Sequence, residues 1–363
     1  MLIRCKWVYI KEVKFVGVFL AESDYSRSQR LMSKLMKILN SIPLIGHFRS
    51  WVLIINLLAL ALLTSCSSSS SSTPDAPQND LEGKVFVLGA QVDDFGNLDL
   101  YVIGTDLSGA VLTVADLQTA SVTVGGVSYN TNDDPELSIT AVSGGDKILS
   151  LGLLTDYSTS TKVEVQAVAD VLTQMLRSMP LVYEAQVMTF SDALETQLAW
   201  TENLTAIEDA VRVVHSDRNE TALYDSMGIA LEGDADTDGL IERCRPAHML
   251  VMFTDGDDNL SSVYSDTGLG TIVNNDRAVV IILSTLKAKI DVLTTLAGDF
   301  GAVVQVADPA SLVTEVDKWA SSLNNMVKFT LDSSINITGK TVGISIGSQI
   351  VEVNPNSHCT LPP

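Results

Sequence analysis

Residues 148–160 read ILSLGLLTDYSTS, and this stretch decides the fold. Its first seven residues are apolar except for Ser150 and Gly152, as expected of a strand that is covered on both faces. A loop of the pattern D-x-S-x-S follows directly, at Asp156, Ser158 and Ser160. A buried strand that ends in a polar loop is typical of an open α/β sheet, where ligands gather at the carboxyl ends of the strands.

Strand-like and helical patterns alternate after this loop. Thr161 and Glu164 form a capping box, which predicts the start of a helix. Further strands are predicted at 187–190, 197–201 (antiparallel), 249–253, 278–283 and 302–306, and further helices at 204–215, 223–231, 287–296 and 311–323. We therefore expect residues 146–325 to form an α/β domain with a doubly wound, mainly parallel sheet.

The regions on either side of residues 146–325 have the alternating apolar and polar pattern of antiparallel strands. Between residues 81 and 145, the runs 84–88, 98–103 and 120–124 are separated by Gly, Asn and Asp clusters, which predicts a small β-domain. Residues 326–363 return to this texture at 327–331, 341–346 and 350–353. These last strands are expected to complete the first β-domain, with the α/β domain inserted between its parts.

The first 65 residues are interpreted as a lipoprotein signal peptide. Residues 51–63 are apolar except for Asn56, a length that suits a signal-peptide core better than a membrane-spanning helix, and basic residues precede them. The sequence LTSC at 63–66 resembles the bacterial lipobox, in which Cys66 is lipidated and becomes the new N-terminus. An uncleaved anchor helix is the alternative. Met32 and Met36 are alternative starts, since the stretch before them is longer than a signal needs.

A lipid on Cys66 would attach the chain to a membrane through the Ser- and Pro-rich linker 66–80, whose composition cannot pack a core. In lipoproteins that this one resembles, a residue such as Ser67 after the cysteine does not retain the protein in the inner membrane. We therefore expect the outer membrane of a cell envelope. In that oxidising compartment, Cys244 and Cys359 are candidates for one disulfide.

Charge excludes nucleic acid as a partner. Residues 1–65 hold nine of the 23 Lys and Arg residues and three of the 44 Asp and Glu residues, so residues 66–363 have a formal charge of −27. A body this acidic repels phosphates. General solubility is the alternative reason for the acidity.

Two further oxygen-bearing residues are expected at the same edge as the D-x-S-x-S loop. Thr221 stands where a helix begins, and Asp255 follows strand 249–253 in the sequence FTDG. Five oxygen ligands, of which only Asp156 and Asp255 carry charge, suit a hard cation such as Mg²⁺, Mn²⁺ or Ca²⁺. A partner protein that presents an Asp or Glu could then complete the coordination shell.

These motifs, in this order, resemble those of the von Willebrand factor A domain over residues 146–325, and the sequence FSD at 190–192 is also similar. The resemblance implies a metal-ion-dependent adhesion site (MIDAS) at Asp156, Ser158, Ser160, Thr221 and Asp255, and a role in metal-dependent protein binding. The chain departs from the family pattern at Thr159 and Asn219, where Gly is usual. The alternative function is that of a structural or stress-sensing envelope lipoprotein whose domain binds no metal, with the hydroxyls only capping helices.

Two other motifs are weaker. The acidic residues Asp234, Asp236, Asp238 and Glu242 match part of a calcium-binding loop, although Arg245 stands where a bidentate Glu belongs, so a solvated loop is the alternative. Residues 343–347, GISIG, match the G-x-S-x-G pattern of hydrolases, but Ser345 is predicted to lie inside a strand rather than at a sharp turn. We expect no enzyme activity.

Overall fold

The computed structural model describes residues 83–353 except 143–145, 162–163, 180–181, 214–219, 277, 286–287, 308–310 and 348. The predicted signal peptide, the linker, Cys66 and Cys359 lie outside the described residues. All described residues belong to one compact unit, residues 74–363. Within the described part of the chain, no helix combines the length and apolar character needed to span a membrane.

The α/β domain is built on a six-stranded sheet with the strand order β11-β10-β9-β6-β7-β8. All neighbouring strands are parallel except β8, which runs antiparallel to β7 at one edge. The predicted doubly wound, mainly parallel sheet is confirmed, including its antiparallel strand. The strands are β6 (Lys147–Asp156), β7 (Val182–Phe190), β8 (Leu194–Thr201), β9 (Ala247–Phe253), β10 (Val279–Thr285) and β11 (Ala302–Val306).

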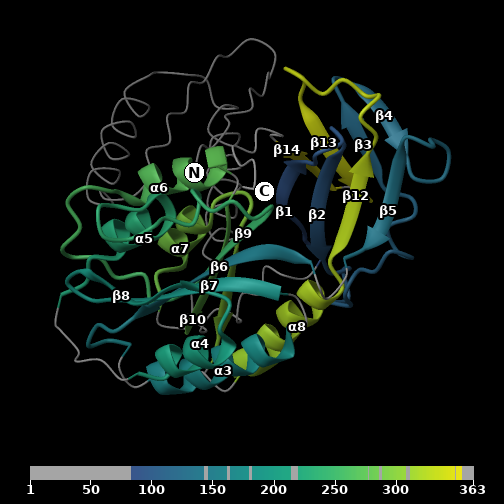
Figure 1. Ribbon diagram of the computed structural model, residues 1–363. Helices are drawn as coiled ribbons and strands as arrows, with labels where there is room; N and C mark the ends of the chain where they lie inside the picture. Colours follow the sequence, from purple (N-terminus) through teal and green to yellow (C-terminus); the bar gives the residue numbers. More distant parts are fainter. Residues whose placement is uncertain are drawn as a thin grey trace, which may run out of the picture. The chain divides into compact units, whose positions relative to one another are not determined.

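Helices cover both faces of this sheet (Figure 1). On one face, apolar side chains of α3 (Val165–Ser178), α4 (Leu204–Val211) and α8 (Leu312–Asn324) share a core with the sheet. On the other face, α5 (Leu223–Glu232), α6 (Asp266–Asp276) and α7 (Ile290–Ala297) do the same. Because both faces are covered, β6 is buried along most of its length, as its nearly continuous apolar sequence predicts.

Several helix predictions were wrong in detail. No capping box forms, because α3 begins at Val165 without a side-chain cap and the Thr161 hydroxyl donates to the carbonyl oxygens of Asp156 and Ser158 instead. Helix α4 ends at Val211 rather than at 215, and α7 begins at Ile290 rather than at 287. Helix α6 was not predicted.

The flanking strands form a second domain of two antiparallel sheets, as predicted for the fold class. The first sheet has the order β1-β2-β12-β5 and the second β14-β13-β3-β4, and one core of apolar side chains lies between them. Strand β12 follows the α/β domain in sequence and pairs with β2 and β5, which precede it. The α/β domain is thus an insertion in the β-sandwich. The strands are β1 (Val85–Val92), β2 (Leu98–Gly104), β3 (Ser121–Val124), β4 (Val127–Asn130), β5 (Leu137–Ala141), β12 (Val327–Leu331), β13 (Val342–Ile346) and β14 (Gln349–Val353).

The sandwich and the α/β domain pack directly on each other. The rings of Phe86 in β1 and Trp319 in α8 lie 4.9 Å apart. A Cβ atom on Gly89 of β1 would come within 1.5 Å of the Pro246 carbonyl oxygen, so only glycine permits this approach of β1 to the start of β9. Contact on both faces explains why every residue of β2 is buried.

Candidate metal centre

Three strands of the six-stranded sheet end at the same level. In the register of the sheet, Asp156 of β6 lies beside Phe190 of β7, and Thr155 lies beside Phe253 of β9. The residues that follow each strand therefore meet at the carboxyl edge of the sheet. A hydrogen bond of 2.7 Å from the Tyr157 amide to the Phe190 carbonyl oxygen fixes the first of these loops to the neighbouring strand.

Asp156 is a fully buried carboxylate, 0% exposed. Its Oδ1 accepts a hydrogen bond from the Ser158 amide and its Oδ2 accepts one from the Thr254 hydroxyl, both at 2.8 Å. Among the described residues, no Lys or Arg forms an ion pair with it. Burial raises the pKa of Asp156 to about 6, because the ionised form loses hydration and gains only neutral donors.

The serines of the D-x-S-x-S loop lie close together beside this carboxylate. Ser158 is buried and Ser160 is exposed, and their Oγ atoms are 3.1 Å apart. The Thr161 hydroxyl donates to the Asp156 carbonyl oxygen at 2.8 Å and to that of Ser158 at 3.1 Å, which folds the chain into a tight turn. Thr159, at the position where the family has Gly, is exposed. The turn thus gathers one carboxylate and two hydroxyls.

Thr221 lies at the start of α5 and is 3% exposed. Its amide donates to Asn259 Oδ1 at 2.8 Å, and its carbonyl oxygen accepts from the amides of Asn259 and Leu260. The next residue, Ala222, donates its amide to the Ser191 carbonyl oxygen at 2.6 Å. The start of α5 is therefore tied to the loops that follow β7 and β9.

Asp255 follows β9 and is partly buried. Its carbonyl oxygen accepts from the Lys289 amide at 2.9 Å, and its Oδ1 accepts from the Asp257 amide at 3.1 Å. Gly256 has φ of 80°, a left-handed conformation that favours glycine and turns the chain away from the strand. The Asp255 charge also opposes ionisation of Asp156.

The structure thus brings the segments that carry Asp156, Ser158, Ser160, Thr221 and Asp255 to one edge of the sheet. Their role as metal ligands stays a prediction. Two carboxylates and three hydroxyls are an oxygen-only donor set that fits a hard divalent cation. The charge on buried Asp156, which only neutral groups contact, fits the same ion.

Two residues at this edge were not given a role from the sequence, Thr254 and Asn259, and Thr161 was expected only to cap a helix. Thr254 precedes Asp255 in the FTDG motif, and its position at the end of a buried strand was a usable signal. Asn259 contacts Thr221 across 38 positions of sequence, and nothing in the sequence alone reveals that contact.

The remaining candidate residues lie elsewhere. Among the described residues, no group of three or more acidic, His or Cys side chains could hold a metal, so Asp234, Asp236, Asp238 and Glu242 are not gathered around an ion. Asp234 instead accepts hydrogen bonds from the amides of Asp236 and Thr237. Ser345 lies within β13, paired with Ser121 and Ile350. Cys244 is disulfide-bonded, while its pairing with Cys359 stays a prediction because Cys359 is outside the described residues.

Comparisons by sequence find no matching family model and no matching curated protein. The chain is similar to the solved structure of proximal thread matrix protein 1 from the mussel byssus, with 15% identity over 52% of this chain and 49% of that protein, at a TM-score of 0.42. Another crystal structure of that protein has a zinc-occupied MIDAS motif. This chain spans about half the length of the mussel protein.

Two further likenesses are to bacterial proteins. One is BatB from Bacteroides thetaiotaomicron, with 12% identity over 48% of this chain and 100% of that protein, at a TM-score of 0.37. The other is a von Willebrand factor type A protein from Catenulispora acidiphila, with 9% identity over 75% of this chain and 71% of that protein, at a TM-score of 0.42.

Likenesses at these identities and TM-scores carry no argument about function. The strand order, the antiparallel edge strand β8 and the D-x-S-x-S turn at the end of the central strand β6 are the features that the resemblance to the von Willebrand factor A domain predicts for the α/β domain.

Proposed function

We propose that this chain is a lipid-anchored cell-envelope protein that binds a partner protein through a divalent cation. The cation would be held by Asp156, Ser158, Ser160, Thr221 and Asp255. When bound, it supplies a coordination position that a partner's Asp or Glu carboxylate can fill. The anchor would be a lipid on Cys66, and Ser67 favours the outer membrane.

The observation that carries this proposal is the environment of Asp156. A buried ionised carboxylate is costly unless it is paired with a cation or a metal. Here the carboxylate is 0% exposed, and the described groups that donate to it, which include the Ser158 amide and the hydroxyls of Thr254 and Thr161, are neutral. A divalent cation at this position would compensate the charge that the described residues leave uncompensated.

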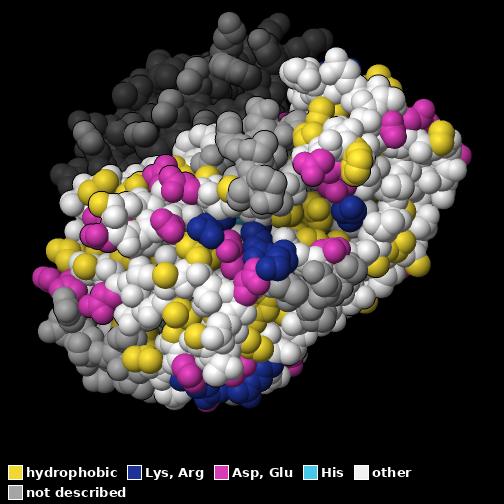
Figure 2. All heavy atoms as spheres, viewed as in Figure 1, with side chains coloured by type: hydrophobic (Ala, Val, Ile, Leu, Met, Phe, Trp, Pro, Cys, Tyr) yellow, Lys and Arg dark blue, Asp and Glu magenta, His cyan; other side chains and the backbone are white. Residues whose placement is uncertain are grey.

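The surface residues near the carboxyl edge of the six-stranded sheet favour a protein as the binding partner. The loop that bonds to Thr221 exposes two apolar side chains, Leu260 at 40% and Val263 at 78%. Beside Asp255, whose carbonyl oxygen accepts from the Lys289 amide, Lys289 Nζ lies 2.5 Å from Asp257 Oδ1, an ion pair at the protein surface. On the face drawn in Figure 2, Asp and Glu side chains are spread widely, whereas Lys and Arg gather at a few places. Such a surface repels a partner carboxylate unless a cation lies between them.

Thermal unfolding of the full-length protein tests whether a divalent cation binds at this site. Mg²⁺, Mn²⁺, Ca²⁺ and Zn²⁺ are each compared with a chelator, and a cation at 100 times its dissociation constant should stabilise the fold by about 2.7 kcal/mol. The Asp156→Ala variant should lose this shift, and the matched control Asp170→Ala, at an exposed position of α3, should keep it. A shift that is absent for every ion, or equal in Asp156→Ala, would favour the metal-free structural protein.

The same variants test the partner. Crosslinking in envelope extracts should capture a protein with the wild-type chain in the presence of the stabilising cation. Capture should be lost with chelator, with Asp156→Ala, and on substitution of an acidic residue in the captured protein. Capture that persists in the chelator would contradict the proposed mode of binding.

A further inference from the structure

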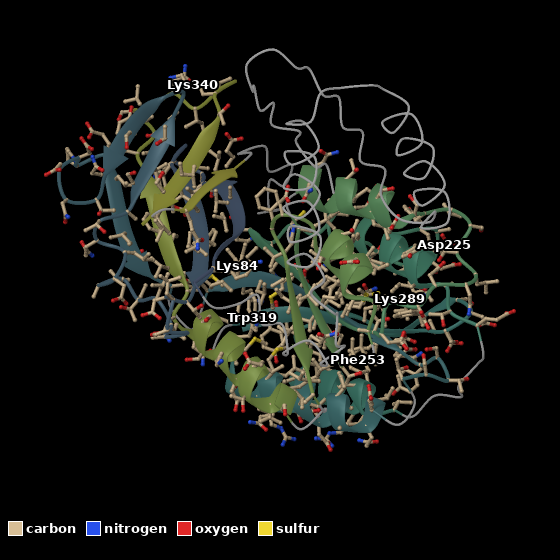
Figure 3. The ribbon with its side chains drawn as sticks, turned by 180° about the vertical axis from the view of Figure 1, so that it is seen from behind. Lys84, Asp225, Phe253, Lys289, Trp319 and Lys340 are labelled. Atoms are coloured by element: carbon tan, nitrogen blue, oxygen red, sulfur yellow. The ribbon has the colours of Figure 1, made fainter. Side chains whose placement is uncertain are left out.

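The loop from Asn259 to Tyr264 makes an unusually dense set of bonds to the start of α5. It follows Asp255 in sequence, and it returns to α5, where Thr221 stands. Asp225, in the first turn of α5, accepts hydrogen bonds from the amides of Ser262, Val263 and Tyr264, at 2.8–2.9 Å. Asp225 and Lys289 both lie among the helices on the α5, α6 and α7 side of the sheet (Figure 3).

Asn259 forms hydrogen bonds directly with the backbone of Thr221. The amide of Thr221 donates to Asn259 Oδ1 at 2.8 Å, while the carbonyl oxygen of Thr221 accepts from the Asn259 amide at 3.0 Å. Both backbone polar groups of Thr221 are therefore bonded to one residue. This reciprocal pair fixes the backbone from which the Thr221 hydroxyl projects.

Aromatic packing holds the far end of the loop. The Tyr264 ring lies so close to Gly228 of α5 that a Cβ atom there would come within 2.5 Å of the ring. The Tyr264 hydroxyl donates to Glu232 Oε2 at 2.8 Å, about one turn beyond Gly228 along α5. The loop is thus attached along α5 from its first residues to its last.

We propose that Asn259 and Asp225 are positioning residues, which hold Thr221 and Asp255 at the spacing that a cation requires. This inference rests on the proposed metal site. Asp255 and Asn259 belong to one short loop, so fixing Asn259 to Thr221 links the ligand after β9 to the ligand before α5. Neither residue needs to touch the ion. Groups that orient metal ligands in this way typically change metal affinity 10- to 100-fold when removed.

Mn²⁺ binding to the full-length protein tests the proposal, with free Mn²⁺ followed by electron paramagnetic resonance. Asn259→Ala should bind Mn²⁺ about 10- to 100-fold more weakly than the wild type. Asn259→Asp keeps an acceptor for the Thr221 amide and should retain the affinity. Asp225→Asn should weaken binding by a smaller factor, since its one oxygen can still accept from the amides of Val263 and Tyr264 while its NH₂ group cannot accept from the Ser262 amide.

Unfolding in chelator separates positioning from folding. A merely structural role for Asn259 predicts a lower stability of the metal-free protein with unchanged Mn²⁺ affinity, and that result would overturn the proposal. Equal loss of affinity in Asn259→Ala and Asn259→Asp would overturn it too. If the wild type binds Mn²⁺ and Asn259→Ala binds equally well, only the positioning role fails. If the wild type itself binds no ion, the proposed metal site fails and the positioning role with it.

Discussion

A carboxylate is buried at each end of the central sheet, and the two carboxylates have different bonding partners. At the amino end, Glu184 of β7 receives a two-point interaction from Arg243, with Nε 2.9 Å from Oε1 and Nη2 3.0 Å from Oε2. Ser150 of β6 donates a further hydrogen bond at 2.7 Å. At the carboxyl end, the described groups that donate to the Asp156 carboxylate are neutral, and they include the Ser158 amide and the hydroxyls of Thr254 and Thr161.

The difference appears in their proton affinities. Burial opposes ionisation of Glu184, but the bonds from Arg243 and Ser150 outweigh it, so its pKa lies below the ordinary value of a glutamate. Burial dominates at Asp156 and raises its pKa to about 6. The first carboxylate is compensated by the chain and serves stability. The second has no cationic partner among the residues that the structure describes, as a site for a cation requires.

The largest effect is expected from Glu184→Gln. It leaves Arg243 and the Ser150 hydroxyl without their charged partner in a largely buried place, and the unfolding free energy should fall by about 3 kcal/mol at neutral pH. Because the pKa of Glu184 is lowered in the folded protein, this stability is present above the unfolded pKa of about 4.5 and is lost as pH falls through the folded value. Urea unfolding at neutral and acidic pH measures both.

Glu202→Gln is the matched control. Glu202 is 40% exposed, and it pairs with Lys147 at 2.8 Å and with Arg245. The pair with Lys147 is exposed, and exposed pairs contribute at most about 1 kcal/mol. Arg245 is only 10% exposed but still lies 3.8 Å from Glu184 Oε1 when Glu202 is changed, so this variant should lose less stability than Glu184→Gln. If Glu184→Gln costs no more than Glu202→Gln, the two ends of the sheet do not differ in the way described above.

In the metal-free protein, Asp156→Asn should raise the free energy of unfolding, whereas Glu184→Gln should lower it. The folded pKa of about 6 exceeds the ordinary aspartate value of 3.8, so the wild type loses stability as pH rises between these values. That difference corresponds to at most about 3 kcal/mol. An amide at this position carries no charge, so Asp156→Asn should be more stable than the chelated wild type above pH 6, by about 2 kcal/mol.

Denaturant unfolding at two pH values checks this sign. The advantage of Asp156→Asn should vanish near pH 4, where the buried carboxyl is protonated in the wild type. Adding Mn²⁺ should reverse the order at neutral pH, because only the wild type offers the Asp156 carboxylate beside Asp255. A variant that is less stable than the chelated wild type at neutral pH would show that Asp156 stabilises the fold by itself.

The comparison also shows what the sequence could reveal. The order of strands and helices and the polar ends of β6 and β9 follow from local patterns, because buried strands are apolar and their carboxyl ends meet at one edge. Contacts between distant segments do not follow from such patterns. The Arg243 pair with Glu184 spans 59 positions and the Asn259 bond to Thr221 spans 38, and neither leaves a periodic signal.

Helix α6 shows a different limit of prediction from the sequence. Its sequence, DTGLGTIVNND, contains two glycines and only Leu269, Ile272 and Val273 as apolar anchors, so its helical pattern is weak. The helix forms because β9 and β10 are parallel neighbours, and a crossover must return the chain to the other end of the sheet. Tertiary topology, not local preference, decides this segment.

The acidic loop at Asp234 gives the smallest expected effect. Asp236 is exposed there, so Asp236→Asn should change the unfolding free energy by less than about 0.5 kcal/mol. Calcium titration monitored by thermal unfolding should give the same shift as in the wild type, because the Asp234 carboxylate bonds to its own loop rather than facing an ion. A calcium shift that disappears in Asp236→Asn but persists in Asp156→Asn would place the ion in the loop and leave the buried carboxylate without its cation.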